Sequence, residues 1–321
     1  MKKMILCGAF VVFAASLGME KKITRKIIDV STVTCKNRRE YQEDTIALFN
    51  KDNFSIFAVF DGHNGKNVSS YLQDNFCNIL YDKIKNKSCT ITLLTEAFET
   101  AEANLRLLFE QETISQSGST VSVVCFDKNK LVVGNVGDSR LIVGNVDGTV
   151  SFATEDHKPK AELGKRLKED QVLCWDSVWR LKLSTLSVSR ALGDIDLKKY
   201  DSALIAAPDC NEILLNENHN CIILGSDGLY DVMSNEEIVK ITNDGIKNNK
   251  SAQEIAKILL YKAIEKNSTD NTSIIVIRLG TSEKQFDFKN LQVVSYDGDE
   301  ETKLLIQKAK QPKNSTNNFF L

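Results

Sequence analysis

Residues 54–65 read FSIFAVFDGHNG, an apolar run that ends in an acidic turn containing glycine. The first seven residues combine aromatic and β-branched side chains, a composition that predicts a β-strand. Asp61 follows this strand directly, so its carboxylate is expected where the strand leaves a sheet. Taken alone, an Asp-Gly pair after a strand indicates only a turn.

The same arrangement recurs along the chain. The apolar stretches 132–137 and 221–226 end at Asp138 and Asp227, and Asp231 lies shortly after. Acidic residues also stand directly before two predicted strands: Glu43 and Asp44 before 45–49, and Asp270 just before 273–279. If these strand ends converge, several carboxylates share one small volume. Two such charges about 4 Å apart, at an effective dielectric constant near 20, repel by roughly 4 kcal/mol, so the cluster requires cations.

Composition indicates which cation. The chain has only three histidines (His63, His157 and His219), and none of its eight cysteines forms a CxxC pair, which argues against zinc. Oxygen ligands alone favour Mg²⁺ or Mn²⁺. We expect the cysteines to be reduced thiols rather than a disulfide framework. A net charge of −2 provides no field that attracts nucleic acid.

Apolar periodicity predicts an α+β protein. Helices are expected at about 68–80 and 94–108, where apolar side chains recur every three or four positions, and after capping sequences at Ser234 and Ser251. Strands are expected at 27–33, 45–49, 54–60, 221–225 and 273–279, with a hairpin meander of four more at 120–126, 131–136, 140–143 and 149–153. This order favours a layered α-β-β-α sandwich of two antiparallel sheets flanked by paired helices. No linker interrupts residues 22–282, which we expect to form one domain.

The two ends of the chain differ from this domain. Lys2 and Lys3 precede an uncharged run (residues 4–19) that is typical of a signal peptide and short for a membrane span. We therefore interpret 1–21 as a signal peptide or N-terminal anchor, the one segment through which membrane association is expected. The alternative is a buried N-terminal helix or strand. Residues 283–321 form a polar extension, expected to be disordered beyond Gln311.

Localisation stays open between the cytoplasm and the secretory pathway or membrane. Asn271-Thr-Ser is a glycosylation sequon within a candidate metal-binding loop. A glycan there would obstruct the site, which argues against passage through a glycosylating compartment.

Eight short motifs stand in order along the chain: Arg39-Glu-Tyr-Gln-Glu43-Asp44, Phe60-Asp-Gly-His63, Ser117-Gly-Ser-Thr120, Gly137-Asp-Ser-Arg140, Asp156-His-Lys-Pro159, Leu186-Ser-Val-Ser-Arg190-Ala-Leu-Gly-Asp194, Asp227-Gly-Leu-Tyr-Asp231 and Asp270-Asn271. Together they resemble the metal-dependent serine/threonine protein phosphatases of type 2C, over about residues 24–280. The resemblance implies that 22–282 is the catalytic domain. It also implies phosphoprotein substrates, and we expect a monomer.

The resemblance implies a role for each candidate residue. Asp61 would bridge two Mg²⁺ or Mn²⁺ ions, with the Gly62 carbonyl, Asp227 and Asp270 on the first ion and Glu43 and Asp44 on the second. Asp138 and Asp231 match positions that hold a weaker third ion in some members. Arg39 would bind the substrate phosphate, and His63 would be the general acid. A water held between the two ions would attack phosphorus without a covalent phosphoenzyme.

The chain departs from the family pattern in two places. Asn64 stands where glycine is usual, and asparagine tolerates a left-handed backbone. In the segment 162–185, which corresponds to a flap beside the active site, Glu162 and Arg166 match but Glu169-Asp170 replaces a glycine pair. We expect Trp175 and Trp179 in this segment to serve packing.

Two other functions remain as alternatives. The first is a catalytically inactive, phosphatase-like scaffold, which the loss of a metal ligand would have favoured. The second is a two-metal hydrolase of nucleotides or small phosphoesters, which predicts a basic or aromatic base-binding surface. Neither feature is present in the sequence.

Overall fold

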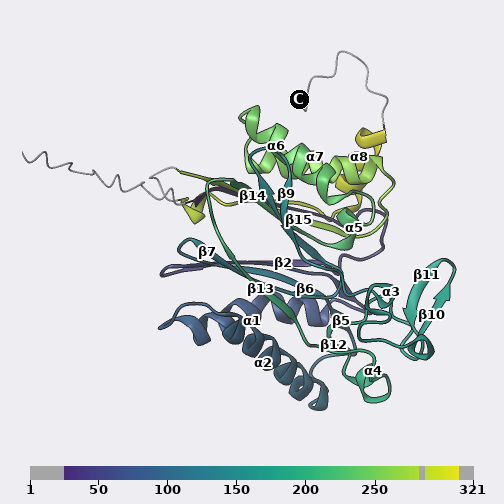
Figure 1. Cartoon of the computed structure of the whole chain (residues 1–321). Coiled ribbons are helices and arrows are strands. Elements are labelled where there is room, and N and C mark those ends of the chain that lie inside the picture. Colours follow the sequence, from purple (N-terminus) through teal and green to yellow (C-terminus); the bar gives the residue numbers. More distant parts are fainter. Residues whose placement is uncertain (1–24, 282–285, 311–321) are drawn as a thin grey trace, which may run out of the picture.

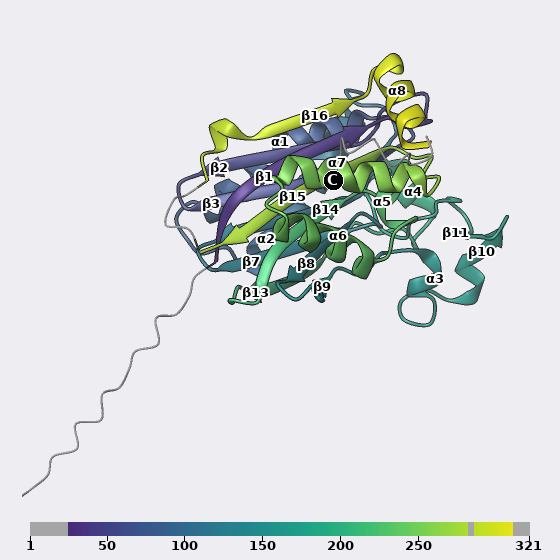
Figure 2. The same cartoon turned by 90° about the horizontal axis from the view of Figure 1, so that it is seen from above.

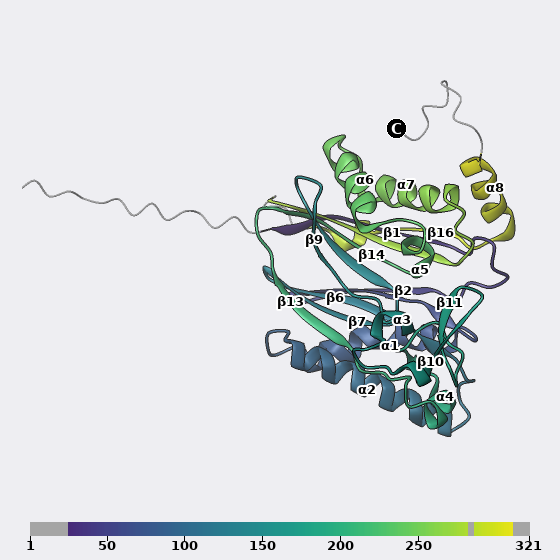
Figure 3. The same cartoon turned by 45° about the vertical axis from the view of Figure 1, so that its right-hand side comes forward.

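The computed structural model describes residues 25–281 and 286–310 and is a four-layered sandwich (Figure 1). Helices α1 (Asn67–Ile84) and α2 (Ile91–Glu110) cover one sheet, and α6 (Asn235–Lys247), α7 (Ala252–Glu265) and α8 (Asp299–Lys310) cover the other. The predicted α-β-β-α architecture is confirmed. The separate layers are clearest from the side, in Figure 3.

The five-stranded sheet is antiparallel throughout and contains the opening stretch of sequence as a central strand. Its strands are β2 (Thr45–Lys51), β3 (Phe54–Phe60), β6 (Val121–Asp127), β7 (Lys130–Val136) and β13 (Asp209–Leu214), in the order β13-β7-β6-β3-β2. Every residue of β3 except Ser55 is buried, because α1 and α2 cover one face and the second sheet covers the other.

The six-stranded sheet has the order β16-β1-β15-β14-β8-β9, which Figure 2 views through α6 and α7. Its strands are β1 (Lys26–Cys35), β8 (Arg140–Asn145), β9 (Val150–Ala153), β14 (His219–Gly225), β15 (Thr272–Gly280) and β16 (Gln292–Tyr296). β16 pairs in parallel with β1, from Ser31 opposite Gln292 to Cys35 opposite Tyr296. Three of the observed elements, β13, β16 and α8, are not predicted from the sequence.

The predicted four-stranded meander is wrong. β6 and β7 form a hairpin in the five-stranded sheet, whereas β8 and β9 form one in the six-stranded sheet. The chain therefore crosses between sheets at residues 137–139, and turn signals alone do not reveal in which sheet the next strand pairs. This crossing places Asp138 at the seam between the two sheets.

The remaining elements are short, and they include those of the expected flap, residues 162–185. They are β4 (Gly62–His63), β5 (Gly118–Ser119), α3 (Pro159–Glu162), the 3₁₀ turn Glu169–Gln171, β10 (Val172–Trp175), β11 (Val178–Leu181), β12 (Leu192–Gly193), α4 (Ile195–Tyr200) and α5 (Asp227–Tyr230); a second 3₁₀ turn, Phe288–Asn290, precedes β16. β10 and β11 form a hairpin that projects from the side of the molecule (Figure 2). The backbone at its tip is left-handed at Asp176 and Ser177, as two-residue hairpin turns require.

The packing prediction is wrong for Trp175, which lies at this tip and is 67% exposed. It is right for Trp179, which packs against a small cluster around Leu181 and Leu204. The segment 162–185 shows no apolar periodicity because ion pairs between side chains, rather than long helices or strands, stabilise it. The Glu162 carboxylate binds both Arg166 and Arg190, at 2.6 Å each.

The N-terminal signal or anchor (1–21) and the tail beyond Gln311 lie outside the described residues. Within 25–281 and 286–310, no helix combines the length and hydropathy needed to cross a bilayer. The seven cysteines in those ranges are free thiols, as predicted.

Phe76 tests the packing that supports the site. Its ring is fully buried between Phe60, the last residue of β3, and Phe98 of α2, with centroid separations of 6.0 and 5.0 Å. We expect Phe76→Ala to lower the free energy of unfolding by about 3–5 kcal/mol, because it leaves a cavity. Leu107→Ala, at a 55% exposed position on α2, should change it by less than about 0.5 kcal/mol. Urea denaturation measures both, and similar losses for the two variants would contradict the assigned packing.

Candidate metal centre

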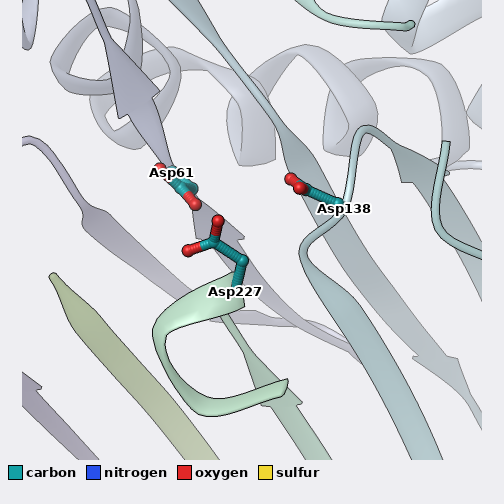
Figure 4. Close-up of side chains that lie close together, drawn as sticks. All are labelled: Asp61, Asp138 and Asp227. Atoms are coloured by element: carbon teal, nitrogen blue, oxygen red, sulfur yellow. The ribbon is translucent and has the colours of Figure 1, made fainter. Parts of the chain in front are cut away.

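Three aspartates from distant parts of the chain meet at one end of the sandwich. Asp61 follows β3, Asp138 lies in the crossing between β7 and β8, and Asp227 begins α5 after β14. One carboxylate oxygen from each lies within 4.8 Å of the other two, and the side chains point toward a shared space (Figure 4). The strand ends that carry these residues converge as the sequence predicts.

Burial and like charge act together on this trio. Burial is the largest cause that raises the pKa of Asp61 well above its usual range, and the charges of Asp227, Asp44 and Asp138 add to it. Asp227 is affected in the same way, first by burial and then by Asp138 and Asp270. A carboxylate cluster with these properties is stabilised by a divalent cation, which neutralises the repulsion.

Asp44 lies outside the trio, but its charge raises the pKa of Asp61 and Asp227. Its side chain is buried, and burial raises its pKa to about 7. Oδ2 accepts a hydrogen bond of 2.8 Å from Ser226, whereas Oδ1 is buried and accepts none. An unsatisfied buried oxygen, in an all-oxygen donor set, fits a hard cation such as Mg²⁺ or Mn²⁺.

Asp270 and Arg39 form an ion pair at the rim of the centre. The Arg39 guanidinium donates to Asp270, and its side chain is 56% exposed. Asp270 is not one of the three carboxylates that meet, but its charge raises the pKa of Asp44, Asp61 and Asp227. The predicted phosphate-binding group and a predicted metal ligand are thus in direct contact.

Glu43 and Gly62 form the wall beside Asp61. The Glu43 side chain accepts a hydrogen bond of 2.6 Å from the backbone of Gly65. A Cβ atom at Gly62 would lie 2.6 Å from the Glu43 carbonyl oxygen and 2.7 Å from Ser69 Oγ, so only glycine permits this approach. Asn64, the departure from the family pattern, has the left-handed φ of 56° that asparagine tolerates.

A lysine occupies the place between Asp138 and Asp231. Lys158 Nζ lies 2.6 Å from Asp231 Oδ1 and 3.4 Å from Asp138 Oδ2. Burial nevertheless raises the pKa of Asp138 to about 6, against the opposing effect of Lys158. Lys158 is a site residue that was not predicted; its place beside His157 in a matching motif was the available signal.

Two further residues that the sequence analysis left without a role support the loops of the centre. Asn271 is buried, accepts a hydrogen bond of 2.9 Å from the Glu43 backbone and donates to the carbonyls of Lys36 and Tyr41. Asp194 lies 2.7 Å from Nε2 of His63. Burial lowers the pKa of His63, but the charge and hydrogen bond of Asp194, together with the charges of Asp138 and Glu43, outweigh this effect and the pKa is raised.

His157 fixes the loop that carries Asp138. Its Nδ1 accepts a hydrogen bond from the Gly137 backbone at 3.1 Å, and its own backbone N–H donates to the Gly137 carbonyl. It contacts Asp209 through Nε2.

Comparison with known proteins agrees with this geometry. The family model for protein phosphatase 2C matches residues 28–272. "Probable protein phosphatase 2C 45" of Oryza sativa is 32% identical over 241 residues, which cover 74% of this chain and 82% of the rice protein. "Probable protein phosphatase 2C 59" of Arabidopsis thaliana is 34% identical over 70% of this chain and 69% of its own length.

Solved structures share the fold. The serine-threonine phosphatase 2C from Toxoplasma gondii superimposes with a TM-score of 0.66 at 23% identity, covering 78% of this chain and 94% of that one. A sex-determining protein of C. elegans gives a TM-score of 0.69 at 22% identity, over 79% of this chain and 65% of that one. With the family match over most of the described sandwich, these findings show that the chain belongs to the protein phosphatase 2C family.

Proposed function

We propose that this protein hydrolyses phosphoserine and phosphothreonine in phosphoprotein substrates, with Mg²⁺ or Mn²⁺ ions held by its carboxylates. The observation that carries the proposal is the meeting of Asp61, Asp138 and Asp227, whose oxygens lie within 4.8 Å of one another. The family membership of the chain supports the same reaction.

We assign the proposed ligands, which include Asp61 and Asp227 of the trio, to two groups. Asp227, Asp270 and the Gly62 carbonyl would serve a first ion, and Glu43 and Asp44 a second, with Asp61 shared by both. When bound, two such ions supply a water acidic enough to attack phosphorus near neutral pH, and positive charge beside the phosphoryl oxygens.

The remaining steps belong to the protein's own side chains. Arg39, half exposed at the rim, would exchange its contact with Asp270 for two parallel hydrogen bonds to the substrate phosphate. His63 would donate a proton to the departing seryl or threonyl oxygen, which is a poor leaving group without one. No protein nucleophile is needed, so we propose direct transfer to water without a phosphoenzyme.

Asp61→Asn tests the shared ligand. We expect phosphate release from a phosphothreonine peptide in Mn²⁺ to fall by more than about 100-fold, because the amide weakens binding of both ions at once. Chelation should abolish the activity of the unmodified protein. Asp74→Asn, at an exposed carboxylate on α1, is the matched control and should retain full activity.

The same assay separates the alternatives. An inactive scaffold would release no phosphate at any metal concentration. A nucleotide or small-phosphoester hydrolase would prefer those substrates to the peptide. Peptide hydrolysis that persists after all divalent metal is removed would overturn the proposed chemistry.

Metal binding should depend on pH, because the ions displace protons from buried carboxyl groups. Burial raises the pKa of Asp44 to about 7 and that of Asp138 to about 6, from an unfolded value of 3.8. Without metal, both groups bind a proton more tightly in the folded protein, so their contribution to stability falls as pH rises from about 4 to about 7. Mn²⁺ replaces those protons, so it should raise the melting temperature more at about pH 7.5 than at about pH 5. Differential scanning calorimetry measures the shift, and a shift independent of pH would contradict this linkage.

Lys158 should limit the number of bound ions. Its ammonium lies against Asp138 and Asp231, the residues proposed for a weaker third ion. We expect Lys158→Gln to take up one more Mn²⁺ ion than the unmodified protein at the same metal concentration, because the two carboxylates lose their cation. Lys165→Gln removes an exposed partner of Glu155 and should leave the stoichiometry unchanged. Titration calorimetry counts the ions, and equal uptake by both variants would refute this role.

A further inference from the structure

A miniature sheet places His63 and Asp194 on either side of one glycine. β4, β5 and β12 have two residues each and pair in the order β12-β5-β4. Within this sheet Gly118 stands opposite His63 on one side and opposite Gly193 on the other. Asp194 is the next residue, so the register of three short strands brings its side chain toward the imidazole.

The two side chains meet across the space that Gly118 leaves. Asp194 Oδ2 lies 2.7 Å from His63 Nε2, and the Asp194 side chain is only 2% exposed. A Cβ atom at position 118 would lie 2.1 Å from Asp194 Oδ2 and 2.3 Å from His63 Nε2. Any other residue at 118 would therefore displace one of the two partners.

The backbone at Asp194 is arranged for this contact rather than for the helix that follows. Asp194 has the left-handed angles φ 48° and ψ 37°, and its N–H donates to the Ser117 carbonyl at 2.9 Å. It occupies the N-cap position of α4, where an aspartate side chain normally accepts a hydrogen bond from the helix. Here the side chain makes no capping hydrogen bond. Helix capping therefore does not explain an aspartate at this position.

The contact determines which imidazole nitrogen can serve the reaction. An ionised carboxylate only accepts hydrogen bonds, so Nε2 of His63 must donate to Asp194. In the protonated imidazole Nδ1 then carries the second N–H, which it can donate to the leaving-group oxygen, leaving a neutral ring. A carboxylate that binds one ring nitrogen fixes the orientation of the ring and the position of its other proton.

We propose that Asp194 is the positioning residue for His63, holding the imidazole so that Nδ1 faces the departing seryl or threonyl oxygen. This inference rests on the proposed phosphatase function. Asp194 acts through the histidine and not on the substrate, so its effect should appear only where a leaving group needs a proton.

Two substrates with different leaving groups test the inference. A phosphothreonine peptide needs a proton on the departing oxygen, whereas p-nitrophenyl phosphate releases a stable phenolate without one. In Mn²⁺ we expect Asp194→Ala to lower kcat on the peptide by about 100-fold with KM unchanged, and kcat on p-nitrophenyl phosphate by less than about 3-fold. Mn²⁺ affinity, measured by calorimetry, should not change.

A double-mutant cycle identifies the path of the effect. His63→Gln should show the same dependence on leaving group, and adding Asp194→Ala to it should cause no further loss, because both remove the same proton donation. Asp196→Ala, two residues further along the chain, is the matched control and should leave both activities unchanged. If Asp194→Ala lowers the melting temperature, Asp194→Asn, which keeps the side-chain shape, replaces it in the cycle.

The outcomes separate the inference from the function on which it rests. Equal losses on the two substrates, or additive losses in the double mutant, would overturn the role of Asp194 and leave the phosphatase proposal intact. Failure of the unmodified protein to hydrolyse either substrate in Mn²⁺ would instead overturn the phosphatase proposal.

Discussion

Repulsion between buried carboxylates is the constraint on which this structure depends. Asp61, Asp138 and Asp227 arrive from the five-stranded sheet, from the crossing between the sheets and from the end of the six-stranded sheet. Bringing them together is unfavourable, and the buried sheets on both sides supply the packing that holds them in place. The carboxylate cluster thus lowers the local stability, and the same repulsion makes the site strongly attractive to cations.

The protein's own cations are distributed in a way that follows from this constraint. Arg39 neutralises Asp270 at the rim, and Lys158 lies between Asp138 and Asp231 on another side. Of these contacts only the longer one, at 3.4 Å to Asp138, reaches a member of the trio. The carboxylates at the rim are therefore largely neutralised by side chains. The central trio instead needs a bound cation to balance its charge.

The sequence predicted those features that depend only on residues close together in the chain. An apolar run followed directly by aspartate predicts both the strand and the position of the acid, and periodic apolar residues predict α1 and α2. What it could not predict depends on partners distant in the chain. The pairing of Asp194 with His63 requires the register of β12, β5 and β4, and the contacts of Lys158 and Asn271 require the two sheets to be packed. Trp175 was assigned to packing because a hydrophobic side chain alone does not show that its hairpin leaves the core.

The parallel strand β16 has a consequence for the integrity of the molecule. It lies beyond the match to the family model, which ends at residue 272, yet it covers the outer edge of β1 along five residues. A polypeptide truncated after β15 would retain every proposed ligand and catalytic group. It would also present a ten-residue strand, Lys26–Cys35, with its hydrogen-bonding edge open to other molecules. With β16 in place, the strand at this edge of the sheet has five residues, and short edge strands are one way in which natural proteins limit self-association.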